Sequence, residues 1–365
     1  MPPNVISIVD PTLQDKTGHC YSFLTAFLDA REVSHPDTTV NVYACRNARG
    51  LLRERCGVTL IPYFIRPLRK LQTPLLYRKL LRAERTLFIP TATRTDLFFL
   101  AIFAGKDLKP GRVTAFIHWF RNTEKRHKQL TKLASKCADI QILTPCESVY
   151  DLFRECGFHN CRLTEYPMTA PVADQAPQEF RKVAYAGAAR RDKGFPHVSR
   201  YVQFLSDKSL DIPAWIQASH PHSGKHPMDI QKAINKLQNL NYPALKLLTS
   251  TLSEEEYTGL FNGAICLQLY DPEEFHDRVS GVTLDALAQG APIIALQGSW
   301  SAAVVEKYKA GLVIKKPDPE SIHRAVENIR TDYKTFSRAA LKAGRTLGRE
   351  HDAKDIFNAV RRTTS

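Results

Sequence analysis

The sequence predicts an α/β protein of two domains, each with a mostly parallel sheet covered by helices on both faces. Short apolar runs alternate with helical patterns along the chain, as they do where helices join parallel strands. A proline-rich stretch at 167–177 interrupts this alternation, and 365 residues suffice for two domains of ordinary size. We expect an N-terminal domain at 1–168, a linker at 169–180, a second domain at 181–345 and a C-terminal helix at 346–365 that crosses back to the first domain.

The first half is expected to begin with a buried strand at 5–9, a loop containing Gly18, and a helix. Further strands are expected at 39–44, 86–89, 113–117 and 139–143. The strand at 113–117 ends at His118. Because ligands of open α/β sheets bind at the carboxyl ends of the strands, His118 is a candidate site residue, or else a histidine with a purely structural hydrogen bond.

The second half repeats the alternation. Strands are expected at 182–187, 214–218, 245–249, 264–269, 292–296 and 311–314. Two helix starts are marked by a capping box from Ser253 to Glu256 and by Asp318 followed by Pro319. The segment 331–362 has a helical pattern.

Composition is that of a globular protein without a membrane span. No apolar run approaches the roughly 20 residues that a bilayer requires, and the N-terminus lacks the basic region of a signal peptide. The eight cysteines contain no CxxC pair, which indicates reduced thiols in a cytoplasmic protein.

The formal charge of +14 is unevenly distributed. Residues 1–170 hold 25 Lys and Arg against 15 Asp and Glu, a net of +10, which leaves 26 against 22, or +4, for the remainder. The densest basic stretch, Arg66 to Arg85, is interleaved with leucines. It is typical either of a helix lying on an anionic membrane surface or of a solvated helix packing its leucines inward. Without a recognisable nucleic-acid-binding motif, no nucleic-acid partner is expected.

A first candidate anion site follows the strand that opens the second half. Gly187 and Gly194 give the backbone freedom there, and Arg190, Arg191 and Lys193 supply three cations that suit a diphosphate. The same pattern also occurs in solvated turns.

A second candidate site follows the strand at 264–269. Asp277 and Asp285 enclose the run Ser280-Gly281-Val282, where a helix is expected to begin. Its unpaired N–H groups and positive dipole end suit a phosphate. Gly290 closes the helix, although an ordinary helix with surface acids has the same pattern.

These motifs carry a resemblance. Asp277-x7-Asp285 resembles the Glu-x7-Glu nucleotide-sugar motif of family 4 glycosyltransferases, with Asp at both ends and Ser280 in place of a usual Phe. Lys193-Gly194 resembles that family's diphosphate-binding segment, whereas Ala188 stands where the family has Arg. His118 is similar to a family histidine that ends a strand near the acceptor.

The resemblance implies two Rossmann-like domains facing each other across a cleft, the GT-B arrangement, and a retaining transfer of a hexose-type sugar from a nucleoside diphosphate to an acceptor hydroxyl. By the same resemblance Gly18, Gly187, Lys193 with Arg190 or Arg191, and the N–H groups at Ser280, Gly281 and Val282 meet the donor's diphosphate.

The remaining roles also follow from the resemblance. Asp285 binds ribose, Asp277 binds sugar hydroxyls and His118 lies near the reacting centre. The acceptor is expected to be a glycan or a lipid-linked glycan of polysaccharide, lipopolysaccharide or glycolipid synthesis, at the inner membrane face. No cofactor or metal is expected, and His220, His222 and His226 are interpreted as a plain loop.

Two other classes remain open. The chain is also compatible with a non-catalytic glycosyltransferase-like protein that binds nucleotide or glycan, because both motif acids and Ala188 depart from the family pattern. It is compatible as well with another GT-B enzyme, such as a sugar epimerase or a phosphorylase.

Overall fold

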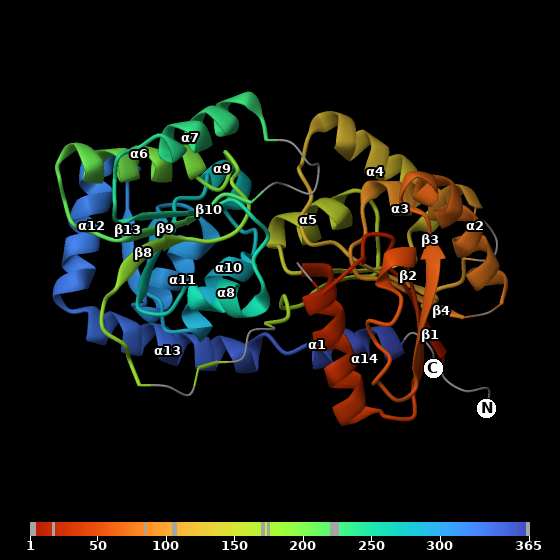
Figure 1. Ribbon diagram of the computed structural model, residues 1–365. Helices are drawn as coiled ribbons and strands as arrows, with labels where there is room; N and C mark the ends of the chain where they lie inside the picture. Colours follow the sequence, from red (N-terminus) through yellow and green to blue (C-terminus); the bar gives the residue numbers. More distant parts are fainter. Residues whose placement is uncertain are drawn as a thin grey trace. The chain divides into compact units, whose positions relative to one another are not determined.

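The computed structural model describes residues 5–16, 19–83, 85–103, 108–168, 172–173, 176–219 and 226–362. The chain divides into two compact units, one formed by residues 1–169 with 351–365 and the other by residues 170–350. Each unit has its own parallel sheet with helices on both faces (Figure 1). The expected α/β class with a parallel sheet in each half is therefore confirmed.

The first unit contains a seven-stranded sheet of order β3-β2-β1-β4-β5-β6-β7. Its strands are β1 (Val5–Val9), β2 (Thr39–Cys45), β3 (Val58–Phe64), β4 (Thr86–Ile89), β5 (Val113–Phe116), β6 (Gln141–Thr144) and β7 (Cys161–Leu163). The sequence pattern missed the two edge strands. β3 is only partly buried and contains Pro62, which is tolerated at a sheet edge, and β7 has three residues.

Within the described residues, six α-helices cover this sheet. They are α1 (His19–Ser34), α2 (Arg69–Arg82), α3 (Arg94–Phe103), α4 (Glu124–Cys137), α5 (Glu147–Glu155) and α14 (Lys354–Arg362), with short 3-10 turns η1 (Arg46–Ala48) and η2 (Arg66–Leu68). The core between the sheet and α2 to α5 is apolar. Leu28 of α1 and Phe357 of α14 belong to a second apolar core on the opposite face. Helix α3 lies between α2 and α4 (Figure 1).

The second unit contains a six-stranded sheet of order β10-β9-β8-β11-β12-β13. Its strands are β8 (Lys182–Tyr185), β9 (Ala214–Gln217), β10 (Leu245–Leu248), β11 (Ala264–Gln268), β12 (Ile293–Leu296) and β13 (Gly311–Ile314). Its helices are α6 (Phe195–Asp207), α7 (Met228–Gln238), α8 (Glu254–Gly259), α9 (Pro272–Phe275), α10 (Gly281–Ala288), α11 (Trp300–Tyr308), α12 (Pro319–Thr331) and α13 (Tyr333–Glu350). Helices α6, α7 and α12 share one apolar core with the sheet.

The helix ends follow the expected chemistry. The capping box of Ser253 and Glu256 is present at α8, and Asp318 caps α12 with Pro319 inside its first turn. Gly290 has φ of +71°, as a residue that ends a helix in the left-handed region should. A Cβ there would lie 2.7 Å from Leu341 Cγ of α13, so the turn also lets α13 pack closely.

The helical pattern at 331–362 is divided into two helices. Helix α13 runs unbroken to Glu350 in the second unit, and α14 follows in the first unit, where it packs on α1. The boundary between the two compact units falls at 350/351.

Two further observations concern the chain as a whole. All eight cysteines are free thiols. Over the part of the chain that the structure describes, no helix has both the length and the apolar character needed to cross a bilayer.

Candidate functional site

The second sheet has a switch point at β8. The chain winds from β8 through β9 to β10 on one side, and then from β11 through β12 to β13 on the other. Loops that follow β8 and β11 therefore leave the same carboxyl edge in opposite directions, which is where open α/β sheets bind ligands. Both motifs singled out in the sequence of this half follow these two strands.

The loop after β8 is held by two glycines. Gly187 has φ of +97° and donates its N–H to Gln217 Oε1 at 2.6 Å. A Cβ at position 187 would lie 3.4 Å from Lys193 Nζ and 3.5 Å from Val282 Cγ2. Gly194 has φ of +73°, and a Cβ there would lie 2.1 Å from the Leu269 carbonyl oxygen. Glycine at both positions thus lets the loop approach the end of β11 and the start of α10.

Lys193 lies at the centre of this convergence. Its Nζ is 5.6 Å from the centroid of the Tyr270 ring, which follows β11. Burial, together with the nearby guanidinium groups of Arg190 and Arg278, lowers the pKa of Lys193 to about 8. A cation whose charge is held at such a cost gains strongly from a bound anion.

The arginines around Lys193 have different partners. Arg190 forms an ion pair with Asp192, with its Nε 2.9 Å from Oδ1. Arg278 lies 3.9 Å from the same carboxylate and 4.6 Å from the centroid of the Phe275 ring. Arg191 is directed to Asp229 of α7 at 2.7 Å, and its side chain is 77% exposed.

Two cations, Arg190 and Arg278, therefore lie close enough to Lys193 to affect its pKa, and Arg191 is not brought to it. The sequence analysis did not predict Arg278 as a cation of this site. It lies within Asp277-x7-Asp285, and its proximity to Lys193 depends on the two loops meeting at the sheet edge.

Helix α10 begins at this edge as expected. Ser280 is its N-cap, with Oγ accepting from the Thr283 N–H at 3.3 Å and donating to the Tyr270 hydroxyl at 3.3 Å. The first N–H groups, of Gly281 and Val282, have no carbonyl partner within the helix. Apart from the flanking residues and the helix's own backbone, no described atom lies within 4 Å of a Cβ built on Gly281, so the space beside it is open.

Asp285 lies one turn into α10. Its Oδ2 accepts a hydrogen bond of 2.8 Å from the hydroxyl of Tyr257 on α8. Burial raises the pKa of Asp285 to about 6, against the opposing effects of that hydrogen bond and of the Lys193 charge. Tyr257 is a second residue that the sequence analysis did not predict, because its contact with Asp285 joins positions 28 residues apart and leaves no local sequence pattern.

Asp277 lies between the short helix α9 and α10. Its Oδ1 is 3.2 Å from His276 Nε2, and 19% of its side chain is exposed. The carboxylate is thus partly exposed a few residues before the start of α10.

His118 follows β5 in the first unit, at that sheet's carboxyl edge. Its Nε2 donates to the Pro90 carbonyl oxygen at 2.8 Å, because a carbonyl can only accept. The imidazole ring is held between Phe116, Phe23 and Tyr166, with centroid distances of 4.9, 5.5 and 5.4 Å. In the neutral ring this bond leaves Nδ1 as the acceptor nitrogen.

The end of β1 adds a polar group to the same edge. Asp10 is 1% exposed, and its Oδ1 accepts from the Thr12 N–H at 2.9 Å and hydroxyl at 2.6 Å. Among the described residues, its Oδ2 has no hydrogen-bond partner. Gly18, the other candidate in this loop, lies outside the described residues.

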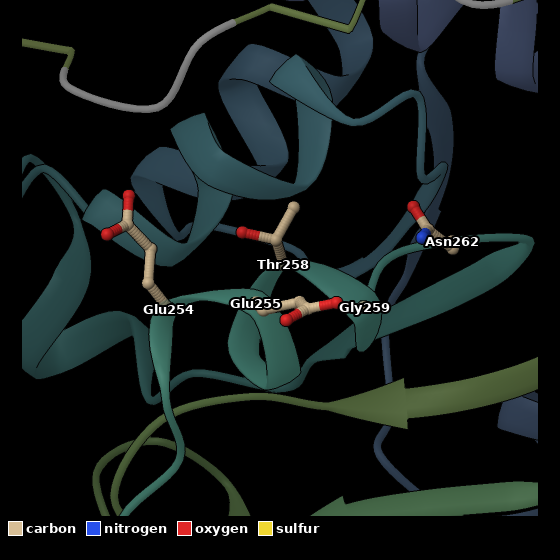
Figure 2. A pocket seen from close by; sticks show the side chains of 5 residues that line it. All are labelled: Glu254, Glu255, Thr258, Gly259 and Asn262. Carbon is tan, nitrogen blue, oxygen red and sulfur yellow. The ribbon is translucent and has the colours of Figure 1, made fainter.

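A shallow pocket lies elsewhere in the second unit, on α8 and the turn after it (Figure 2). It is lined by Glu254, Glu255, Thr258, Gly259 and Asn262. The carbonyls of Gly259 and Asn262 already accept from Lys182 Nζ at 3.1 and 2.7 Å. Its two carboxylates would repel a diphosphate, so the basic edge at Lys193 is the better anion site.

The described ranges hold no group of three or more His, Cys, Asp or Glu side chains placed so that they could hold a metal ion. His220 and His222 lie outside the described residues.

Two α/β units, each with its own parallel sheet, define the class of two-domain α/β folds. Comparison with solved structures defines the fold of the chain more closely. It is similar over 99% of both chains to HepE of Anabaena in complex with UDP and glucose, with a TM-score of 0.68 and 14% identity.

Two other solved structures agree. Sucrose-phosphate synthase of Thermosynechococcus elongatus has a TM-score of 0.68 at 13% identity, over 99% of this chain and 98% of that chain. A glycosyltransferase from Rickettsia africae has a TM-score of 0.67 at 11% identity, over 100% and 97%. The chain thus has the GT-B glycosyltransferase fold of two Rossmann-like domains. No family model and no curated protein matches the sequence.

Proposed function

We propose that this protein is a retaining glycosyltransferase that moves a hexose-type sugar from a nucleoside diphosphate sugar to an acceptor hydroxyl. The observation that carries the proposal is the meeting of Lys193, the α10 N-terminus and Asp285 at the switch point of a GT-B fold. Several similar structures hold UDP or UDP-glucose, so a UDP-linked sugar is the first donor to test.

The donor roles follow from where charge develops. As the bond between sugar and diphosphate breaks, negative charge grows on the departing phosphate and positive charge on the sugar ring. Lys193 and the N–H groups of Gly281 and Val282 stabilise that phosphate, with Arg190 and Arg278 as the flanking cations. Arg278 thereby supplies the charge that Ala188 does not. This set of cations is the reason to expect activity without a divalent metal.

The hydroxyl groups of the donor have their own partners. Asp285 accepts hydrogen bonds from ribose, and Tyr257 holds its carboxylate in place from the side. Asp277 accepts from sugar hydroxyls.

The acceptor is assigned to the first domain. His118 binds near the reacting centre, with its ring held at Nε2 by the Pro90 carbonyl. Asp10, with one carboxylate oxygen that has no partner within the described residues, is a second acceptor-side candidate. A glycan or lipid-linked glycan of polysaccharide, lipopolysaccharide or glycolipid synthesis is the proposed acceptor class.

A non-catalytic nucleotide-binding protein is the alternative, favoured by the two Asp residues that stand for the Glu pair. Binding without release of nucleoside diphosphate would select this alternative.

Thermal melting against UDP, GDP, ADP and CMP tests the donor site, because a ligand that binds only the folded state raises the melting temperature. Arg278→Gln and Arg191→Gln are a matched pair, since each removes one cation. Loss of a charged contact costs about 1.5–3 kcal/mol, so we expect Arg278→Gln to weaken nucleotide binding about tenfold or more and Arg191→Gln less than twofold. Equal effects, or no shift with any nucleotide, would contradict the assignment.

A further inference from the structure

The first unit has a surface that donor binding does not use, built from η2, α2 and α3. Nine large hydrophobic side chains are exposed in the described residues, and six of them lie on these three elements. The six are Leu68, Leu71, Leu75, Phe98, Ile102 and Phe103, with exposed fractions of 46, 70, 61, 47, 50 and 39%. Exposed apolar side chains are normal singly, but a gathering of them marks an interaction surface.

Helix α2 divides its apolar residues between two faces. Leu76, Tyr77, Leu80 and Leu81 are at most 2% exposed and pack in the core. Leu68, Leu71 and Leu75 recur at spacings of three and four and therefore form a separate stripe. Packing of leucines into the core therefore explains Leu76, Leu80 and Leu81. It does not explain Leu68, Leu71 and Leu75, which stay exposed.

Helix α3 extends this stripe. It packs against α2, and Phe98 and Ile102 lie one turn apart on its exposed side. The sequence pattern did not single out α3, whose outer face is apolar without being basic.

The charge around the stripe has one sign. Residues 58–83 contain six Lys and Arg and no Asp or Glu. Arg66, Lys70, Arg78, Lys79 and Arg82 are exposed, and Arg78, Lys79 and Arg82 line a hollow with Leu75. Asp96, the acid on α3, is engaged by the Tyr77 hydroxyl at 2.8 Å and by Thr93. An apolar stripe flanked by cations complements anionic lipid headgroups above acyl chains.

We propose that η2, α2 and α3 form a docking surface for an anionic lipid bilayer. The leucine and phenylalanine side chains enter the headgroup boundary, while the arginines and lysines lie at the level of the lipid phosphates. Helices α2 and α3 begin where β3 and β4 end, so their first turns lie at the carboxyl edge of the sheet. That placement suits a lipid-linked acceptor, a point that rests on the proposed function; bilayer binding itself does not.

Sedimentation of the full chain with vesicles tests the proposal. We expect binding to vesicles of phosphatidylcholine with phosphatidylglycerol, little binding to phosphatidylcholine alone, and weakening as salt rises. Each cation near an anionic surface contributes about fivefold to binding, so Arg78→Gln with Lys79→Gln should weaken it about thirtyfold. Lys232→Gln with Lys236→Gln, on exposed positions of α7, is the matched charge control and should change binding less than twofold.

The apolar contribution has its own pair of variants. Leu71→Ser with Leu75→Ser should weaken vesicle binding about tenfold or more. Val33→Ser with Met228→Ser, each 75% exposed elsewhere, should not. Retained nucleotide binding in all variants shows that folding and the donor site are intact, so failure of one proposal is distinguishable from failure of the other.

The contrary outcomes are equally specific. Absence of vesicle binding at low salt overturns the proposal. A dimer in light scattering that Leu71→Ser with Leu75→Ser dissociates, without vesicle binding, would assign this surface to a second copy of the chain.

Discussion

At the scale of single residues, the donor site combines a lysine and an aspartate whose charged forms are both disfavoured. Burial lowers the pKa of Lys193 to about 8 and raises the pKa of Asp285 to about 6. Both shifts mean that burial disfavours the ionised form of these groups in the protein alone. Both charges are therefore available to a ligand that brings a phosphate to one and hydroxyl groups to the other.

These two pKa values predict a bell-shaped pH dependence of nucleoside diphosphate binding. Above pH 8 Lys193 loses its charge while Arg190 and Arg278 keep theirs, and below pH 6 Asp285 becomes protonated. We expect the tightest binding between these limits and about a tenfold loss by pH 9. Calorimetry in buffers of different ionisation enthalpy should show proton uptake on binding near pH 8, because a bound phosphate raises the pKa of Lys193. An affinity unchanged from pH 6.5 to 9 would exclude Lys193 from the contact.

The raised pKa of Asp285 predicts that this carboxylate lowers the stability of the folded protein at neutral pH while it contributes to nucleotide binding. Its pKa is raised in the folded protein, so the folded state binds more protons than the unfolded state between pH 4 and 6, and stability from this group is lost as pH rises. Asp285→Asn should raise the free energy of unfolding by about 1–2 kcal/mol at pH 7, after allowance for partial exposure, and by little at pH 4. The same variant should lose nucleotide affinity. Denaturant titrations at both pH values check the sign; a destabilised variant at pH 7 would contradict it.

The sequence was most informative where a residue's role depends on its neighbours in the chain. Lys193-Gly194, Ser280 and Asp285 were singled out from local patterns. Arg278 and Tyr257 were missed because each depends on a tertiary approach, of the β11 loop to the β8 loop and of α8 to α10. Arg190 and Arg191, adjacent in sequence, differ only in where the folded loop directs them.

At the scale of elements, all strands of the second sheet were predictable, whereas the two edge strands of the first sheet, β3 and β7, were not. The strands from β8 to β13 are short apolar runs bounded by turns, and the expected ranges overlap all of them. β3 is interrupted by Pro62 and is only partly buried, and β7 has three residues. The sequence pattern predicted α13 and α14 as one helical segment because both helices are amphipathic. The break between them, at residues 351–353, is where the chain passes from the second unit to the first.

The turn between α10 and β12 carries a prediction at this scale. Gly290→Ala places a Cβ 2.7 Å from Leu341 and forces alanine to a φ of +71°. We expect a loss of about 1–3 kcal/mol, which is a fall of roughly 2–10 °C in melting temperature. Gly259→Ala is the control, since no described atom beyond its chain neighbours and the helix backbone lies within 4 Å of its Cβ, and its φ is not positive. Equal melting temperatures for the two variants would show that the turn tolerates a side chain.

At the scale of the whole molecule, the fold was predictable from the alternation of strands and helices with one proline-rich interruption. Solved structures of 11–14% identity share it over nearly the whole chain. At such identity, the roles of site residues cannot be transferred from the similar structures to this chain. The function proposed here therefore depends on the fold bringing Lys193, Asp285 and α10 to one sheet edge.

The central claim is that this edge binds a nucleotide sugar and assists departure of its diphosphate. The most direct test is release of nucleoside diphosphate from UDP-, GDP- and ADP-linked hexoses by the purified protein, with and without EDTA, compared with Lys193→Ala and Asp285→Asn. We expect release from one donor that is unaffected by EDTA, about a hundredfold slower in Lys193→Ala, and with weaker donor affinity in Asp285→Asn. Equal release by all three proteins would contradict the site, and binding without release would leave a nucleotide-binding protein in place of the enzyme.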